Sequence, residues 1–174
     1  MTSGTAADIR VQRLVADDVA EYRRIRLAAL TDAPDAFGSS FEIEREQPET
    51  AYRERLVSSV VCGGYIGTEI VGMAGLARED GPKRRHKAML WGVYVQPQAR
   101  GRGIATALLG ELLRTADADV EQVLLTVVSD NAVAIALYRT LGFESYGLEP
   151  RALKVGPRYI DQLLMVRFAN ARQR

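Results

Sequence analysis

The sequence predicts a single domain of the α/β class, in its α+β form, with helices interleaved between the strands of a mostly antiparallel sheet. The chain has 174 residues, which is enough to bury one sizeable core. Its apolar segments follow the order strand, two helices, three strands, helix, strand, helix and two strands. A lone strand–helix–strand unit in the second half adds one parallel pair. We therefore expect residues 1–174 to form one domain around a mixed sheet, with residues 1–7 flexible.

The first half of the chain predicts one strand, two helices joined by a loop, and three further strands. Residues 9–15 alternate as a strand, and Asp17 and Asp18 can cap a helix over residues 17–33. Proline and glycine residues mark 34–49 as a loop. The remaining segments are a short helix at 49–59 and strands at 60–67, 69–79 and 87–95.

The second half predicts a helix, a strand, a second helix and two final strands. The first helix begins near Gly103, and its apolar stripe consists of Ile104, Leu108, Leu112 and Leu113. The second helix covers residues 129–142, where Asn131 belongs to the capping segment and Gly142 ends the helix. The strands occupy residues 121–128, 143–150 and 158–168.

The composition narrows the classes of function. A formal net charge of +1 argues against a general role at nucleic acids or membrane surfaces, and no apolar run reaches the length of a membrane span. Cys62 is the single cysteine and His86 the single histidine, so internal disulfides and Cys- or His-cluster metal sites are excluded. Together with the absence of a secretory leader in this sequence, this predicts a cytoplasmic protein without a metal.

A basic, glycine-rich turn is the strongest functional signal. The residues Arg100-Gly101-Arg102-Gly103-Ile104-Ala105 follow a predicted strand and open a helix. A helix N-terminus carries unpaired N–H groups and a partial positive charge, which makes it an anion site. The arginines can add charge-assisted contacts to a phosphate. The spacing of a P-loop is absent, and the turn comes too late in the chain for a Rossmann fingerprint.

Two motifs together resemble the GCN5-related N-acetyltransferase (GNAT) family. The turn matches the family's acetyl-CoA signature, Gln/Arg-x-x-Gly-x-Gly/Ala, at Arg100, Gly103 and Ala105. The following helix carries Asn131, Tyr138 and then Leu-Gly-Phe at residues 141–143, which is the second motif of the family. The resemblance is best over residues 73–168, and it implies a seven-stranded sheet with about four helices on its two faces.

The resemblance implies acetyl transfer from acetyl-CoA to a primary amine of a small molecule or peptide. The pantetheine arm would lie between two splayed parallel strands, against the backbone of Val93, Tyr94 and Val95. Asn131 would hold the pantetheine, and Tyr138 would donate a proton to the departing thiolate. The residues implied to bind the cosubstrate are Val93, Tyr94, Val95, Arg100, Gly101, Arg102, Gly103, Ile104, Ala105, Thr106, Asn131 and Tyr138.

The general base is not evident from the sequence. Some members of the family place a glutamate on the strand before the asparagine helix, but the matching position is Thr126. Glu42 and Glu44 are weak candidates in the predicted loop that would border the acceptor pocket, and a solvated acidic run explains them equally well. His86 and Asp161 are further candidates, and a bound water is another. Cys62 fits a small buried residue better than a nucleophile.

The sequence does not identify the acceptor substrate either. An acidic rim at Glu42, Glu44, Glu46 and Glu49 would suit a cationic amine, although charged rims steer ligands more than they specify them. A homodimer paired along the C-terminal strand is compatible with the resemblance. The main alternative function is an acyl-CoA-binding module without transferase activity, which the missing strand glutamate favours and Tyr138 opposes. A nucleotide-binding domain unrelated to coenzyme A is the weakest alternative.

Overall fold

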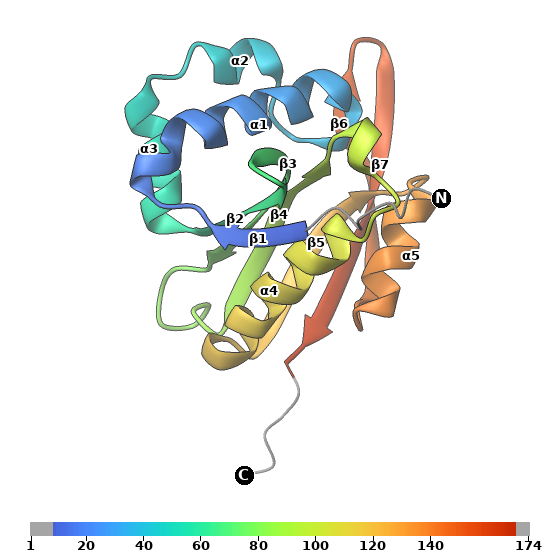
Figure 1. Cartoon of the computed structure of the whole chain (residues 1–174). Coiled ribbons are helices and arrows are strands. Elements are labelled where there is room, and N and C mark those ends of the chain that lie inside the picture. The colour runs from blue at the N-terminus through green and yellow to red at the C-terminus, as the bar shows by residue number, and fades with distance from the viewer. Residues whose placement is uncertain (1–8, 170–174) are drawn as a thin grey trace, which may run out of the picture.

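A seven-stranded sheet forms the centre of the molecule, with its strands in the order β1-β2-β3-β4-β5-β7-β6. The computed structural model describes residues 9–169, so the expectation of flexibility for residues 1–7 falls outside the described part. All neighbouring strands are antiparallel except β4 and β5, which are parallel. The predicted mixed, mostly antiparallel sheet is therefore confirmed, together with its single parallel pair (Figure 1).

The elements follow the predicted order, with additions in the first half. The strands are β1 (Ile9–Arg13), β2 (Val60–Ile66), β3 (Glu69–Arg78), β4 (Lys87–Val95), β5 (Gln122–Val128), β6 (Glu144–Val155) and β7 (Arg158–Phe168). The helices are α1 (Val19–Asp32), α2 (Phe41–Arg45), α3 (Glu49–Ser58), α4 (Ile104–Asp119) and α5 (Ala132–Thr140). Short 3-10 turns are η1 (Ala16–Asp18), η2 (Pro34–Ala36) and η3 (Pro97–Ala99).

Each face of the sheet has its own apolar core. Helices α1 and α3 pack on one face, where Tyr22, Ile25, Tyr52 and Met73 are buried together. Helices α4 and α5 pack on the other face, where the largest group of buried side chains includes the α4 stripe predicted from the sequence: Ile104, Leu108, Leu112 and Leu113. Figure 1 shows α1, α2 and α3 gathered on one side of the sheet, and α4 and α5 on the other.

A bulge in β4 changes which side chains face which core. Before the bulge, Leu90 packs with α4 while Trp91 packs with α1. Gly92 has φ +64, a left-handed value that glycine adopts without strain. After it, Val93 packs with α4 and Tyr94 with α1, so the usual alternation of the strand has shifted by one residue. The bulge therefore reorients the last part of β4.

Two elements differ from the sequence prediction. The segment expected as a loop contains η2 and helix α2, whose first turn is capped by the Ser40 side chain, which accepts a hydrogen bond from the Ile43 N–H. Strand β6 continues to Val155, beyond the predicted end at residue 150, because an irregularity between Glu149 and Leu153 lets it resume pairing with β7. Proline and glycine residues predicted a break in regular structure at both places. They gave no sign of the Ser40 cap of α2 or of the irregularity in β6.

Candidate active site

The parallel strands β4 and β5 separate at one end. They pair only from Lys87–Gln122 to Met89–Leu124, after which β4 continues beside β3 and β5 continues beside β7. Helix α4 follows the end of β4, and α5 follows the end of β5. The gap between the strand ends and both helix N-termini therefore lie at the same edge of the sheet, where ligands bind in open α/β sheets.

The N-terminus of α4 is open for an anion. Gly101 has φ +74 and Gly103 has φ +82, so both glycines adopt conformations that other residues rarely take. No side chain caps the helix, and an added Cβ at either glycine would meet no atom within 4 Å. No side chain therefore competes for the first-turn N–H groups of this 16-residue helix, as expected of a phosphate site.

The neighbouring arginines differ in what they contact. Arg100 is exposed, and its Nε donates a hydrogen bond to the Val95 carbonyl at 3.0 Å. Arg102 is exposed in the turn itself. Arg100 therefore also fastens the turn to the end of β4, a structural role that the sequence did not predict. Its guanidinium retains further N–H donors for an anion.

Asn131 and Tyr138 come from α5. The Asn131 side chain caps the helix by accepting a hydrogen bond from the Ala134 N–H at 3.1 Å, which leaves its amide NH₂ as a donor. Tyr138 is 7% exposed and lies edge-to-face against Phe143 at a centroid distance of 5.9 Å. Burial raises the pKa of Tyr138 to about 12, so the phenol keeps its proton at neutral pH.

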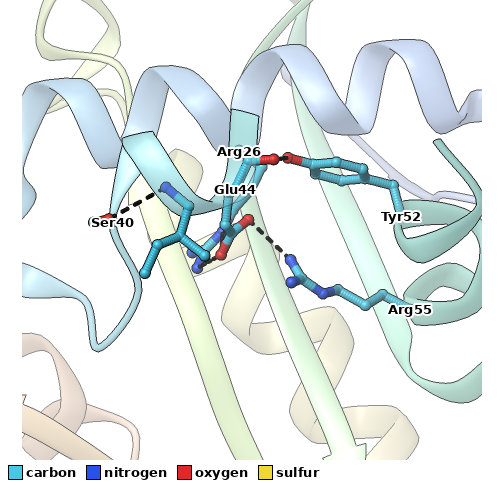
Figure 2. A network of polar contacts seen from close by, with 6 residues as sticks. Arg26, Ser40, Glu44, Tyr52 and Arg55 are labelled. Carbon is cyan, nitrogen blue, oxygen red and sulfur yellow. Dashed lines mark hydrogen bonds and ion pairs between the residues drawn. The ribbon is translucent and has the colours of Figure 1, made fainter. Parts of the chain in front are cut away.

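Glu44 does not lie on an acidic rim. It is 1% exposed, and its carboxylate accepts hydrogen bonds from Arg26 Nη2 at 2.7 Å and from Arg55 Nη1 at 2.9 Å (Figure 2). Burial alone would raise the pKa of Glu44, but the hydrogen bonds and charges of the two arginines outweigh it and lower the pKa to about 2. A carboxylate with so low a pKa binds a proton weakly, which argues against Glu44 as a base.

The other acidic residues of the predicted rim are exposed. Glu42 lies on α2 and has no ion-pair partner among residues 9–169. Glu46 pairs with Arg45 at 2.8 Å, and Glu49 pairs with Arg53 at 2.7 Å. Exposed pairs of this kind contribute little to stability, and they reduce the negative charge that a cationic amine would meet.

Thr126, at the position where some members of the family carry a glutamate, is exposed on β5. The remaining candidates lie in varied surroundings. His86 precedes β4, and its carbonyl accepts a hydrogen bond from the Glu121 N–H at 2.8 Å, at the end of β4 opposite to Val95. Asp161 Oδ1 accepts a hydrogen bond from the Arg151 N–H at 2.7 Å, in the irregular part of β6. Cys62 is buried, and burial raises the pKa of its thiol to about 11.

Arg26 and Arg55 were not identified as site candidates from the sequence. Arg26 follows Ile25 on the apolar face of α1, and a charged residue at that position is a signal of a buried partner. Its partner, Glu44, is only 18 residues away, but the helical turn that aims Glu44 inward lies in a segment that the sequence predicted to be a loop.

Among residues 9–169, no group of three or more His, Cys, Asp or Glu side chains could hold a metal. No helix in that range is long and apolar enough to cross a membrane.

The model of the acetyltransferase (GNAT) family matches residues 24–143. The chain belongs to the GNAT acetyltransferase family. It is an acyltransferase of the N-acetyltransferase type, and the cosubstrate of the family is acetyl-CoA. The family assignment and the predicted fold are thereby confirmed.

Several relatives are similar to this GNAT chain. L-amino acid N-acetyltransferase AaaT of Escherichia coli is 32% identical over 123 residues, which cover 70% of this chain and 74% of that protein. N-alpha-acetyltransferase RimI of Mycobacterium tuberculosis is 37% identical over 110 residues, covering 62% and 68%. An uncharacterized protein of Mycobacterium leprae is 38% identical over 115 residues, and the match spans only 31% of that longer protein.

A solved structure has the same fold. The yncA protein of Salmonella typhimurium, solved with its cofactor acetyl-CoA, superimposes with a TM-score of 0.80 at 20% identity. The match covers 94% of this chain and 95% of that chain. The fold therefore extends well beyond the residues matched by the family model, into the C-terminal strands.

Proposed function

We propose that this chain transfers the acetyl group of acetyl-CoA directly to a primary amine of a small molecule or peptide. The observation that carries the proposal is the divergence of β4 and β5 after Met89–Leu124, beside the open N-terminus of α4. The divergence leaves strand backbone for an extended pantetheine arm, and the helix supplies N–H groups for a diphosphate. An acyl-CoA-binding module without activity would need the same features, but it would not need Tyr138.

The chain offers three groups of contacts to acetyl-CoA. The backbone of Val93, Tyr94 and Val95 would bind the pantetheine arm on the side of β4 that faces away from β3. The N–H groups from Gly101 to Thr106 would bind the diphosphate, with Arg100 and Arg102 as charge partners. Asn131 would bind the arm through its free amide NH₂. These residues are Val93, Tyr94, Val95, Arg100, Gly101, Arg102, Gly103, Ile104, Ala105, Thr106, Asn131 and Tyr138.

Tyr138 is proposed as the general acid. The cosubstrate supplies a thioester, whose carbon–sulfur bond breaks as the acceptor nitrogen forms its bond to the acetyl carbon. The phenol of Tyr138 would give its proton to the departing sulfur. Its raised pKa keeps that proton in place across the neutral range, and no described residue accepts a hydrogen bond from its hydroxyl.

The acceptor amine must also lose a proton. With Glu44 held by two arginines, we propose that the proton leaves either to Glu42 or to a bound water. Glu42→Gln separates the two, since a water-based route would keep its rate while a Glu42-based route would lose about 100-fold. The exposed Arg45→Gln, also on α2, serves as the matched control.

We also propose that the protein is cytoplasmic and that it can form a homodimer. The single cysteine is buried, which suits a reducing cytoplasm. For a homodimer, pairing along the C-terminal strand is not available, because β7 is hydrogen-bonded to β5 on one side and to β6 on the other. A dimer formed by sheet extension would use an edge strand, β6 or β1.

One experiment tests the transferase. The protein is incubated with acetyl-CoA and a panel of primary amines, and the release of free thiol is followed. Turnover on at least one amine supports the proposal, and binding of coenzyme A without turnover on any amine would indicate the binding module. Failure to bind coenzyme A would refute both.

A further inference from the structure

The buried ion cluster on the α1 side of the sheet carries one positive charge more than it needs. Arg26 and Arg55 both bind the Glu44 carboxylate, so two cations share one anion. Arg55 reaches solvent with 36% of its side chain exposed, whereas the side chain of Arg26 is only 8% exposed. Water can solvate part of the charge of Arg55, and an anionic ligand beside Arg26 would neutralise the net positive charge of the cluster.

Two of the three guanidinium nitrogens of Arg26 bind Glu44, and the third does not. Its Nε and Nη2 bind Glu44 at distances from 2.7 to 3.2 Å, which fixes the plane of the guanidinium. The hydrogen bonds among residues 9–169 include none from Nη1. A Cβ built on Gly92 would lie 3.1 Å from Met73 Cε and 3.8 Å from this Nη1, so the free nitrogen lies beside the bulge of β4.

The free nitrogen lies close to the part of β4 that is proposed to bind the cosubstrate. Val93 to Val95, directly after Gly92, are the residues proposed to bind the arm that carries the thioester. An acceptor amine must come to the same end of β4. The ring of Phe37, the residue directly after η2, lies 5.2 Å from the Arg26 guanidinium carbon and covers the cation. An anion beside Nη1 would therefore be partly shielded from water, where charge-assisted hydrogen bonds are strong.

We propose that Arg26 binds the α-carboxylate of a free amino acid through Nη1, and that free amino acids are the acceptor class of this enzyme. The amine and the carboxylate of an α-amino acid are attached to one carbon. A carboxylate at Nη1 would therefore place the amine next to the bulge, close to the backbone of Val93. Glu44 acts as a positioning residue that holds the guanidinium, and Arg26 and Arg55 together keep Glu44 ionised. This inference rests on the proposed acetyl transfer.

The test compares amino acids with their C-terminal amides. The amide keeps the amine and the side chain but has no carboxylate. Thiol release is measured for a panel of L-amino acids and the matching amides with acetyl-CoA. We expect kcat/KM for the best amino acid to exceed that of its amide by about 10- to 100-fold, the range that one charge-assisted hydrogen bond supplies.

Three variants assign the preference to Arg26. Arg26→Met should bring the ratio of acid to amide close to one, and Arg26→Lys should give an intermediate ratio because a point charge replaces the fork. Arg114→Met is the matched control, because Arg114 lies exposed on α4 and pairs with Glu111, and its ratio should equal that of the wild type.

A double variant separates binding from folding. Arg26→Met leaves the Glu44 carboxylate with a single partner, so the variant can lose activity by unfolding. Arg26→Met combined with Glu44→Leu removes the buried pair and should recover thermal stability. If the ratio of acid to amide stays near one in this stable double variant, Arg26 binds the carboxylate. If the ratio recovers with stability, Arg26 acts only through the fold and the inference is wrong.

A binding measurement provides a second readout. Trp91 is the only tryptophan and precedes the bulge, so its fluorescence should change when an amino acid binds to the complex with coenzyme A. The amide should cause no such change at the same concentration. Equal turnover of acids and amides, or acetylation only of amines without a carboxylate, would overturn this inference and leave the transferase standing. No turnover on any amine would overturn both.

Discussion

The indole of Trp91 lies against Gly75 of the neighbouring strand, so close that a Cβ at Gly75 would stand 2.4 Å from the ring atom Cε2. The two residues are register partners in β3 and β4. The glycine thus makes room for a large ring directly before the bulge at Gly92.

The first prediction concerns this contact. Gly75→Ala should lower the free energy of unfolding by about 1–3 kcal/mol, because the ring must move within a packed core. Chemical unfolding followed by tryptophan fluorescence measures the loss. Gly38→Ala is the control, since a Cβ there meets no atom within 4 Å. A Gly75→Ala protein as stable as Gly38→Ala would show that the ring can move freely.

The second prediction concerns the low pKa of Glu44. A group whose folded pKa lies below its unfolded value stabilises the fold above the unfolded pKa, and this contribution is lost as pH falls. Because the folded pKa is about 2 and the ordinary value is 4.5, stability should decline between about pH 5 and pH 2. A change of this size in the pKa makes the contribution of Glu44 about 3 kcal/mol.

Glu44→Gln provides the comparison for this prediction. The variant should be less stable than the wild type at pH 7, by about 3 kcal/mol, because Arg26 would lose its buried counter-charge. Its stability should fall less steeply between pH 5 and pH 2, as measured by urea unfolding across that range. Equal slopes for both proteins would mean that Glu44 is not the group that titrates.

The third prediction concerns the open turn before α4. Gly103→Ala should cost about 1–2 kcal/mol of stability, since φ is +82 there and alanine is strained in that region. The added methyl group would project where the diphosphate is proposed to bind, so affinity for coenzyme A should fall by about 10-fold or more. Calorimetric titration measures the affinity.

Gly110→Ala is the matched control within the same helix. A Cβ at Gly110 meets no atom within 4 Å and the residue lies inside α4, so alanine should stabilise the helix by about 0.5–1 kcal/mol. Its affinity for coenzyme A should equal that of the wild type. If Gly103→Ala also binds coenzyme A normally, the diphosphate does not approach this turn.

Sequence periodicity predicted the sheet and most helices because these elements bury one face each. The α4 stripe at Ile104 and Leu108 is buried as its spacing indicated, and Asn131 and Gly142 bound α5 as cap residues do. The divergence of β4 and β5 was implied only by the family resemblance. The spacing of apolar residues does not indicate the residue at which β4 and β5 stop pairing.

The acidic segment after α1 could not be predicted correctly from local pattern. Glu42 and Glu44 are both acidic in a polar stretch, yet one is exposed and the other is 1% exposed. The difference arises from a single turn of helix that aims Glu44 at Arg26, a contact made across 18 residues. Burial of a charge depends on such a partner, and a partner is visible only once the chain has folded.

The last prediction concerns Tyr138. Tyr138→Phe should lower kcat by about 100-fold, the contribution of a general acid, while affinity for coenzyme A and stability stay near those of the wild type, because no hydrogen bond of the hydroxyl to residues 9–169 is lost. Since the pKa of Tyr138 is about 12, kcat/KM should rise with pH as the acceptor amine deprotonates and should not decline before about pH 10. Tyr146→Phe, at an exposed position of β6, is the control for steady-state assays from pH 6 to pH 10. Unchanged turnover in Tyr138→Phe would assign protonation of the sulfur to solvent.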